Sequence, residues 1–327
     1  MYQRMLVPLD GSKLSEVVFP YAKELAGRLG LEVVLLHVHS PGESETVPLH
    51  RAYIEHKAEM IRRQSQEVQT KVGVGEVGRA VQVRGELAVG YPADEILRYA
   101  EENDVDLILM ATHGRSGIRR WVMGSVADRV LRASKVPVWL VRAGIPEGIV
   151  YDKWPKRTIL VPLDGSGLAE EVLPHVEALA KQHGTELLEV VLLRVYEPVS
   201  ALGYYPPSAR FETPSGAVHV MPRDYARGER ARQKIITEQY LAGVSQRLNG
   251  AGLNKVRFEA LAGTPAEVIV DYANNHPFNL IVMSTHARSG LSRWAYGSVA
   301  ARVLHGVSSP IFLVRAGATK TAELRSP

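Results

Sequence analysis

An internal repeat is the feature that most constrains how this chain can fold. The seven residues Leu6–Ser12, LVPLDGS, return unchanged at Leu160–Ser166, 154 positions later. Residues 110–144 and 283–317 are identical at about 21 of 35 positions, with an offset of 173. A chain that carries one long sequence unit twice is expected to fold as two similar domains, and 327 residues are enough for each to bury its own core.

The domain boundaries follow from where these matches begin and end. We predict a first domain at residues 1–144, a linker at 145–156, a second domain at 157–317 and a tail at 318–327. The later offset is larger by 19 positions, so the second copy contains additional residues. We assign this insertion to about 198–227, because that segment is rich in Pro, Gly and Tyr, a composition typical of surface loops.

Each copy alternates short apolar runs with longer amphipathic segments. In the first copy, strands are predicted at residues 4–9, 32–38, 80–84, 107–110 and 136–141, and helices at 12–29, 49–72, 92–102 and 119–133. Apolar strands separated by helices are typical of a parallel sheet with helices on both faces. The predicted fold class is therefore α/β, with two doubly wound, parallel, five-stranded, Rossmann-like sheets in tandem.

Composition excludes several classes of function. The chain has no cysteine, which excludes disulfides, thiolate catalysis and cysteine metal sites. Its net charge of +4 is small and its basic residues are scattered, so we expect no nucleic-acid binding. The apolar runs are strand-length, shorter than the roughly 20 residues that span a bilayer. We therefore expect a soluble, cytoplasmic protein with no membrane partner.

The ligand site of a doubly wound sheet lies beyond the carboxyl ends of its strands, where the strand order reverses. The first predicted strand delivers Pro8 and Asp10 to that rim, and a carboxylate there can accept a hydrogen bond from an adenine amino group or a ribose hydroxyl. The fourth strand is followed by Thr112–Ser125, THGRSGIRRWVMGS, which leads into the next helix. Free amides at a helix N-terminus, with a serine hydroxyl, form an anion site. Together these features predict a nucleotide pocket.

These residues also carry a resemblance to a known family. The chain resembles a tandem universal stress protein, in which two copies of that domain are fused, over nearly all of both halves except 198–227. ATP-binding members of that family carry Gly, two residues, Gly, nine residues, then Gly-Ser or Gly-Thr after strand four. The corresponding positions of the first copy hold Ala111, Gly114, Gly124 and Ser125. Those of the second copy hold Ser284, Ala287, Gly297 and Ser298, so both leading glycines are replaced there.

The resemblance implies ATP as the bound molecule, with any magnesium ion held through its phosphates. It assigns the base to Asp10 and Asp164, the adenine slot to Val38 and Val195, and the phosphates to the Gly-Ser-Val segment of each copy, with a histidine of each copy nearby. The predicted cofactor-binding residues are Pro8, Asp10, Val38, Met110, Ala111, His113, Gly114, Arg115, Gly124, Ser125 and Val126 in the first copy, and Asp164, Val195, Ser284, His286, Gly297, Ser298 and Val299 in the second.

The replaced glycines predict that the two sites differ. Alanine keeps its amide N–H, so a hydrogen bond to phosphate can survive the replacement. If the position needs a left-handed backbone, the added methyl group costs roughly 1–2 kcal/mol. That is about a 5- to 30-fold loss of affinity. We therefore expect ATP to be held mainly by domain 1.

Each of these residues also has a purely structural interpretation. Asp10 and Ser12 are compatible with an ordinary helix start, Ser125 and Ser298 with the first turn of any helix, and the two loop histidines with hydrogen bonds to backbone. His37 and His39 alternate on the second predicted strand and face the same side. No third ligand is in view, so we predict no metal site there.

Two classes of function remain. The first is an ATP-binding stress-response or signalling protein, and the alternative is a nucleotide-independent interaction scaffold of the same fold. The chain lacks a GxxxxGK[ST] phosphate loop, a GxSxG elbow and an HExxH motif, so no catalytic residue is assigned and at most slow ATP hydrolysis is expected. We expect the last strands, VPVWLV and SPIFLV, to pair across an internal pseudo-twofold axis, which leaves a further homodimer open.

Overall fold

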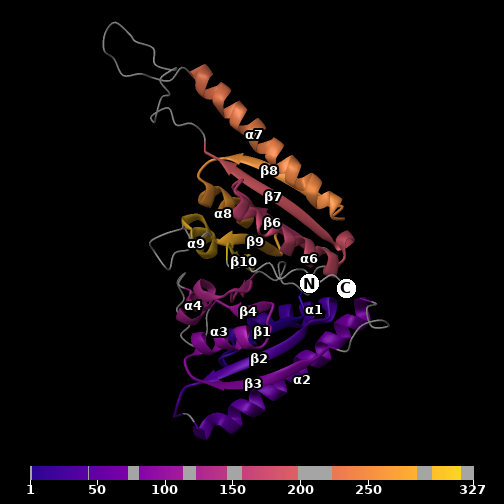
Figure 1. The fold of residues 1–327 in the computed structure, drawn as a ribbon, viewed down its shortest axis with the longest axis vertical. Helices are drawn as coiled ribbons and strands as arrows, with labels where there is room; N and C mark the ends of the chain where they lie inside the picture. The colour runs from indigo at the N-terminus through magenta and orange to yellow at the C-terminus, as the bar shows by residue number, and fades with distance from the viewer. Residues whose placement is uncertain are drawn as a thin grey trace, which may run out of the picture.

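One continuous sheet runs through the whole molecule. The computed structural model describes residues 2–42, 44–72, 81–112, 123–145, 157–197, 223–285 and 297–317. Within them, ten strands form a single sheet in the order β3-β2-β1-β4-β5-β10-β9-β6-β7-β8 (Figure 1).

The two halves contain the same succession of strands and long helices, and differ in their short helical turns. The strands of the first half are β1 (Arg4–Pro8), β2 (Glu32–His39), β3 (Val83–Val89), β4 (Leu107–Ala111) and β5 (Val138–Val141). Its helices are α1 (Phe19–Leu29), α2 (Val47–Val72), α3 (Pro92–Glu102) and α4 (Ser125–Ala133), with 3₁₀ turns η1 (Ser15–Val18) and η2 (Ser44–Thr46). The strands of the second half are β6 (Arg157–Pro162), β7 (Leu188–Tyr196), β8 (Val256–Ala262), β9 (Leu280–Thr285) and β10 (Ile311–Arg315). Its helices are α5 (Gly167–Glu170), α6 (Leu173–His183), α7 (Arg223–Gly250), α8 (Pro265–Asn275) and α9 (Ser298–Gly306), with the 3₁₀ turn η5 (Thr185–Leu187).

Each half is a parallel, doubly wound sheet, which confirms the predicted fold class. All neighbouring strands pair in parallel except β5 and β10. The order reverses between β1 and β4 in the first half and between β6 and β9 in the second. The ligand rim of this fold class is therefore where β1 and β4 end, and again where β6 and β9 end.

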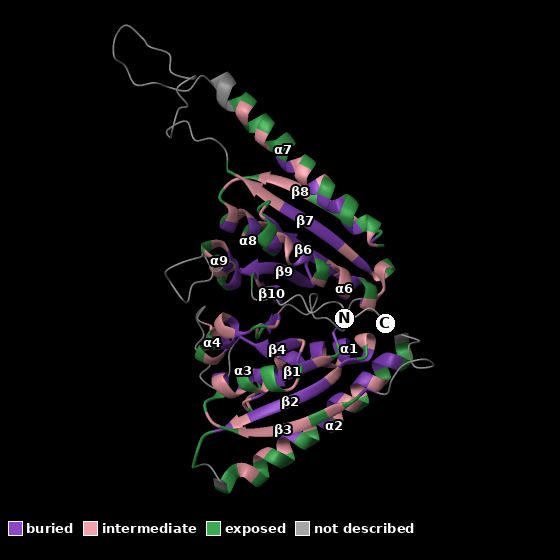
Figure 2. Cartoon of the chain, viewed as in Figure 1, coloured by how far each residue is buried: buried purple, intermediate pink, exposed green. Residues whose placement is uncertain are grey.

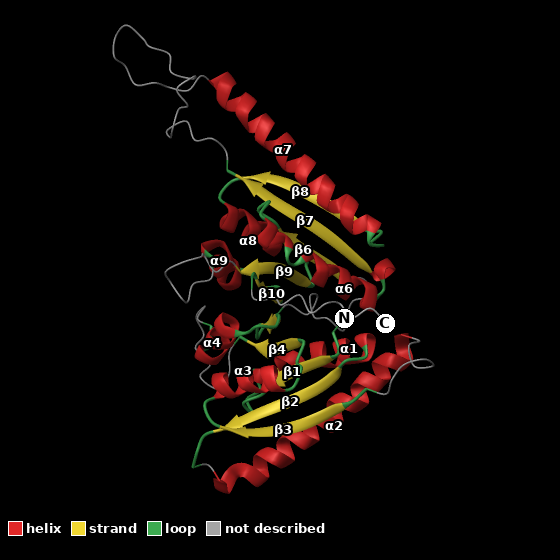
Figure 3. Ribbon diagram, in the orientation of Figure 1, coloured by secondary structure: helices red, strands yellow, loops and turns green. Residues whose placement is uncertain are grey.

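Helices cover both faces of the sheet. Met5 and Val7 of β1 belong to one buried cluster with α1 and α2, and Leu6 belongs to a second with α3 and α4, because successive strand residues face opposite sides. The long helices α2 and α7 lie along β3 and β8 at the outer ends of the sheet (Figure 3). Figure 2 shows buried residues along β2 and β7 and exposed residues along α2 and α7.

Two predicted elements were placed wrongly. The third strand, predicted at residues 80–84, lies at Val83–Val89. β3 is an edge strand and carries the charged residues Arg84 and Glu86. Charged side chains on an edge strand prevent it from pairing with other chains. They also interrupt the run of apolar residues by which the other strands were predicted. The helix predicted from residue 12 begins as η1, and α1 starts at Phe19. Pro20 lacks an N–H and is therefore suited to the first turn of a helix rather than its interior.

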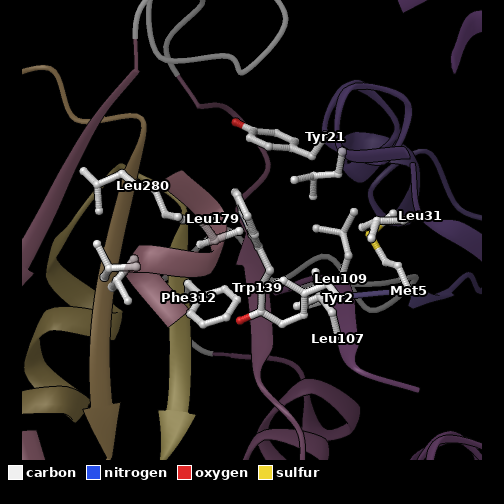
Figure 4. Close-up of a cluster of buried hydrophobic side chains, with 14 of the residues drawn as sticks. Tyr2, Met5, Tyr21, Leu31, Leu107, Leu109, Trp139, Leu179, Leu280 and Phe312 are labelled. Atoms are coloured by element: carbon white, nitrogen blue, oxygen red, sulfur yellow. The ribbon is translucent and has the colours of Figure 1, made fainter. Parts of the chain in front are cut away.

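The two halves meet at an antiparallel seam between β5 and β10, which confirms the predicted pairing of the last strands. Trp139 lies opposite Phe312 in the register, and their rings meet edge to face with centroids 5.9 Å apart. Tyr21 lies 6.4 Å from Trp139, and Tyr2 6.2 Å from Phe312 (Figure 4). The Tyr2 hydroxyl is also 2.6 Å from Nδ1 of His175, so contacts between the halves extend beyond the two strands.

A buried ion pair crosses the same interface. The guanidinium of Arg157 on β6 lies 3.8 Å from the carboxylate of Glu24 on α1, and their side chains are only 1% and 7% exposed. Glu24 also pairs with Arg28, 2.6 Å away. Buried charges are tolerated only when they are paired. The opposite charges of Glu24 and Arg157 therefore suit the contact between α1 and β6.

Acid is expected to weaken this interface through His183. Burial, with Arg157 and Arg28 nearby, lowers the pKa of His183 from 6.5 to about 3. Below pH 6.5, His183 therefore binds a proton in the unfolded chain but not in the folded chain. The free energy of unfolding falls as the pH drops toward 3. By about pH 4.5 this group alone costs about 2–3 kcal/mol. Urea unfolding of wild type and His183→Gln at pH 7 and 4.5 measures it: the loss on acidification should be smaller in the variant by that amount, and an equal loss in both proteins would contradict the assignment.

No helix in the described ranges combines the length and apolarity needed to cross a bilayer.

Candidate functional site

Asp10 lies where β1 leaves the sheet. The N–H of Leu9 still donates to the carbonyl of Leu36, 2.9 Å away, so the pairing with β2 continues one residue past β1. Gly11 then adopts a φ of 81°, which turns the chain sharply. One carboxylate oxygen of Asp10 accepts hydrogen bonds from the Ser12 N–H (2.9 Å) and the Ser12 hydroxyl (2.6 Å). This Asx turn fixes the orientation of a half-buried carboxylate at the rim.

The start of α4 is tied directly to the end of β4. Gly124 is the N-cap residue, with φ −59° and ψ 145°, and its N–H donates to the carbonyl of Thr112, 2.8 Å away. The N–H of Thr112 donates in turn to Val141 of β5 (2.9 Å). Among the described residues, no side chain caps this helix. The amides of its first turn have no helical acceptor and lie at the positive end of the dipole, an arrangement that suits an anion.

Three of the predicted lining residues gather on one face of the sheet. Val38, Met110 and Val126 come from β2, β4 and α4; Met110 belongs to the cluster under α3 and α4, and the two valines pack against it. Met110 is 4% exposed, while Val38 and Val126 are half-buried. Pro8 is buried and pairs with Leu36. An apolar surface therefore lies beside the Asp10 turn and the start of α4.

The replaced glycine of the first copy carries no backbone strain. Ala111 is the last residue of β4, and its methyl group packs in the opposite cluster, under α1 and α2. Among the described non-glycine residues, only Asp104 has a positive φ. The cost of a left-handed alanine therefore does not apply at Ala111. The same holds for Ser284, which is buried in β9.

Several predicted residues lie outside the described ranges. They are His113, Gly114 and Arg115 in the first copy and His286 and Ala287 in the second. The insertion predicted at about 198–227 lies outside them up to residue 222, and α7 begins at Arg223. The linker from residue 146 and the tail from 318 are likewise outside them.

The second half repeats this arrangement, but its aspartate is more exposed. Asp164 accepts a hydrogen bond from the Ser166 N–H (2.8 Å) beside Gly165, whose φ is 89°. Gly297 caps α9 without a side-chain bond, and Ser298 is exposed. Val195 and Val299 pack against the same buried cluster, which extends through both halves. Asp164 is exposed, however, where Asp10 is half-buried.

An arginine that sequence analysis missed distinguishes the second rim. Because Pro8 pairs with Leu36 and Pro162 with Leu193, Arg194 is the counterpart of His37. A methyl group added to Gly165 would lie only 2.8 Å from the Arg194 guanidinium carbon, so the guanidinium lies against the Asp164 turn. It also stacks on Tyr240, 4.7 Å from the ring centroid. Aligning the second strands of the two copies would have revealed this difference.

The architecture defines a class of protein. Two Rossmann-like α/β halves joined edge to edge, each with an aspartate turn and a glycine-capped helix at its rim, make a tandem doubly wound α/β protein. The sequence profile of the universal stress protein family matches residues 1–142 and 156–315. The chain therefore belongs to the universal stress protein family.

Individual relatives match either one half or both. A universal stress protein of Methanocaldococcus jannaschii is 31% identical over 142 residues, which is 43% of this chain and 83% of that protein. One from Mycobacterium tuberculosis is 23% identical over 238 residues, 72% of this chain and 70% of that protein. The crystal structure of a universal stress protein from Archaeoglobus fulgidus has a TM-score of 0.57 at 21% identity and covers 96% of this chain and 98% of that one. At this level of sequence identity, the similarity of the two structures supports the fold alone.

Proposed function

We propose that this chain is a stress-response or signalling protein that binds an adenine nucleotide, ATP, at the rim of its first half. The observation that carries the proposal is the convergence of three features where β1 and β4 end. These are the oriented carboxylate of Asp10, the start of α4 at its N-cap Gly124, and the apolar surface of Val38, Met110 and Val126. Each suits a different part of a nucleotide.

The roles follow from the chemistry of each group. Asp10 accepts a hydrogen bond from a ribose hydroxyl or the adenine amino group, and the apolar surface receives the flat base. The first-turn amides of Ser125 and Val126 bind phosphate oxygens. The described residues contain no group of three His, Cys, Asp or Glu side chains placed to hold a metal ion. We therefore assign any magnesium ion to the phosphates of the nucleotide.

The proposal places the nucleotide mainly in domain 1, residues 1–144, rather than domain 2, residues 157–317. Ala111 lies in an extended strand, so its replacement of a glycine does not weaken the first site through strain. At the second rim, Asp164 is exposed and the guanidinium of Arg194 lies against its turn. The guanidinium thus occupies space beside the second turn, next to Gly165, where the first half has His37 as the counterpart of Arg194.

The test is direct. Freshly purified protein is denatured, the released small molecules are identified by mass spectrometry, and ATP is titrated calorimetrically into nucleotide-free protein. The expected result is about one ATP per chain. Two would show that the second rim also functions, and no nucleotide with no binding heat at millimolar ATP and magnesium would refute the proposal.

The alternative is an interaction scaffold that uses the same fold without nucleotide. It is favoured by Ala111 and Ser284, whose side chains are buried in the sheet where ATP-binding relatives carry glycine. The scaffold requires no ligand at either rim, so the same titration separates the two functions. We place either protein in the cytoplasm, and association of two chains would add to the pairing already present within one.

A further inference from the structure

The helix α7 carries a group of basic residues on the part that extends past the sheet. Figure 1 shows α7 continuing beyond the arrowheads of β7 and β8. Residues 227–236 belong to that part, and they precede Thr237, the first buried residue among the described side chains of α7. They include four basic residues, all exposed, and one acidic residue, Glu229. This end of the molecule therefore presents an excess of positive charge.

Three of these basic residues continue the row of side chains by which α7 packs on the sheet. That row is spaced three and four residues apart, and its buried members are Thr237, Leu241, Val244 and Leu248. The same spacing carried toward the N-terminus gives the basic stripe, Arg227, Arg230 and Lys234. Residues three and four apart lie on one face of a helix. The basic stripe therefore lies on the side of α7 that faces the sheet, at the level where the helix has passed the strand ends and its side chains are exposed.

The charges of the basic stripe are only partly neutralised by the rest of the chain. Among the described residues, Arg227 and Arg230 form no ion pair, and Lys234 forms one, with Glu238 at 3.6 Å. Glu229 lies 3.9 Å from an arginine outside the stripe. Exposed ion pairs of this kind contribute little and exchange readily with other partners. The stripe is therefore available to an external anion.

A fourth cation, Arg194, lies near the inner end of the basic stripe. Its guanidinium stacks on the ring of Tyr240, 4.7 Å from the centroid, and Tyr240 follows Thr237 by about one helical turn. Within the described ranges, the guanidinium of Arg194 donates no hydrogen bond to another residue. Stacking on an aromatic ring holds a guanidinium in place without using its N–H groups. These N–H groups therefore remain available to an oxyanion.

We propose that the basic stripe and Arg194 bind a linear polyphosphate, a chain of phosphate groups without bases. Arginine binds phosphate oxygens through two N–H groups at once. Neighbouring side chains of the stripe lie about 5–6 Å apart, so one extended anion can contact several of them. Residues 227–236 contain no aromatic side chain on which a nucleic-acid base could stack. The stripe also lacks the apolar anchors on which protein interfaces depend, so a ligand recognised by charge alone fits it best.

The first half has no counterpart of the basic stripe. Helix α2 begins at Val47, seven residues before its first buried residue, Ile54, whereas α7 begins fourteen residues before Thr237. The short exposed start of α2 contains one arginine, Arg51, which lies 3.8 Å from the carboxylate of Glu55. The polyphosphate site is therefore particular to the second half, and it is separate from the nucleotide site proposed for the first.

The test is a calorimetric titration of tripolyphosphate, and of a longer polyphosphate, into the full chain at low salt. Wild type should bind both, with an affinity that falls as salt is added, because exposed charges are screened. The triple variant Arg227→Gln, Arg230→Gln, Lys234→Gln should bind about tenfold more weakly or worse, since each exposed ion pair is worth about 1.4- to 5-fold in affinity. Gly124→Val should bind polyphosphate as wild type does, which separates this site from the proposed nucleotide site.

The matched control removes the same charges from α2. Arg51→Gln, Arg63→Gln, Lys71→Gln changes two arginines and one lysine at exposed positions, and it should leave polyphosphate affinity unchanged. Circular dichroism checks that both triple variants are folded. No polyphosphate binding by wild type overturns the proposal, as does equal affinity in the two triple variants. Tighter binding of single-stranded DNA or polyglutamate of equal charge would also overturn it, because the ligand would then be a nucleic acid or an acidic protein segment.

Discussion

Trp139→Ala is expected to lower the free energy of unfolding by about 3–5 kcal/mol. Trp139 is 1% exposed in β5 and contacts Phe312 of the other half as well as Tyr21 of its own. Truncation leaves a cavity at the seam that the strands cannot close without breaking the pairing of β5 with β10. Urea unfolding followed by circular dichroism measures the change.

Tyr91→Ala is the control for this experiment. Tyr91 is also aromatic but is 75% exposed, and surface substitutions of this kind stay within about 0.5 kcal/mol. If Trp139→Ala destabilises the protein no more than Tyr91→Ala does, the seam contributes little to stability and the two halves are held together elsewhere.

Gly124→Val is expected to abolish ATP binding at the first rim, a loss of more than about a hundredfold in affinity, or roughly 2.8 kcal/mol. The φ of −59° is open to any residue, and the hydrogen bond from the residue 124 N–H to Thr112 can persist, so the variant should fold. The branched side chain would instead crowd the phosphates at the start of α4. Calorimetric titration with ATP measures the effect.

Gly297→Val is the matched variant in the second half. Gly297 has nearly the same backbone angles, and a Cβ added there meets no atom of the described residues within 4 Å. Since we place the nucleotide mainly in the first half, this protein should bind ATP as wild type does. Unchanged ATP affinity in Gly124→Val would count against the assigned geometry.

The repeat made most of the fold predictable. Strands such as β4, apolar and buried on both faces, stand out from their sequence alone. The pairing of β5 with β10 was also predictable from the sequence, because the last strand is apolar in both copies. The edge strand β3 was misplaced because its residues face solvent as well as core, which leaves its sequence pattern weak.

The candidate site was predictable only where its residues adjoin a strand end. Asp10 and Gly124 fall at the rim by virtue of their place in the chain, whereas the contact of Arg194 with the Asp164 turn depends on side-chain packing that only the fold shows. The strain assigned to the replaced glycine depended on backbone angles that sequence does not specify, and Ala111 is in fact extended.

Because the antiparallel seam joins two halves of one chain, the two halves can acquire different substitutions. In a homodimer of single domains, every substitution appears twice, and assembly depends on protein concentration. Here β5 finds β10 on the same chain, so association is intramolecular at any dilution. Each half can then change without altering its partner. The fused chain can therefore carry an imidazole in one half and a guanidinium at the equivalent place in the other, as it does at His37 and Arg194, which a homodimer of identical domains cannot.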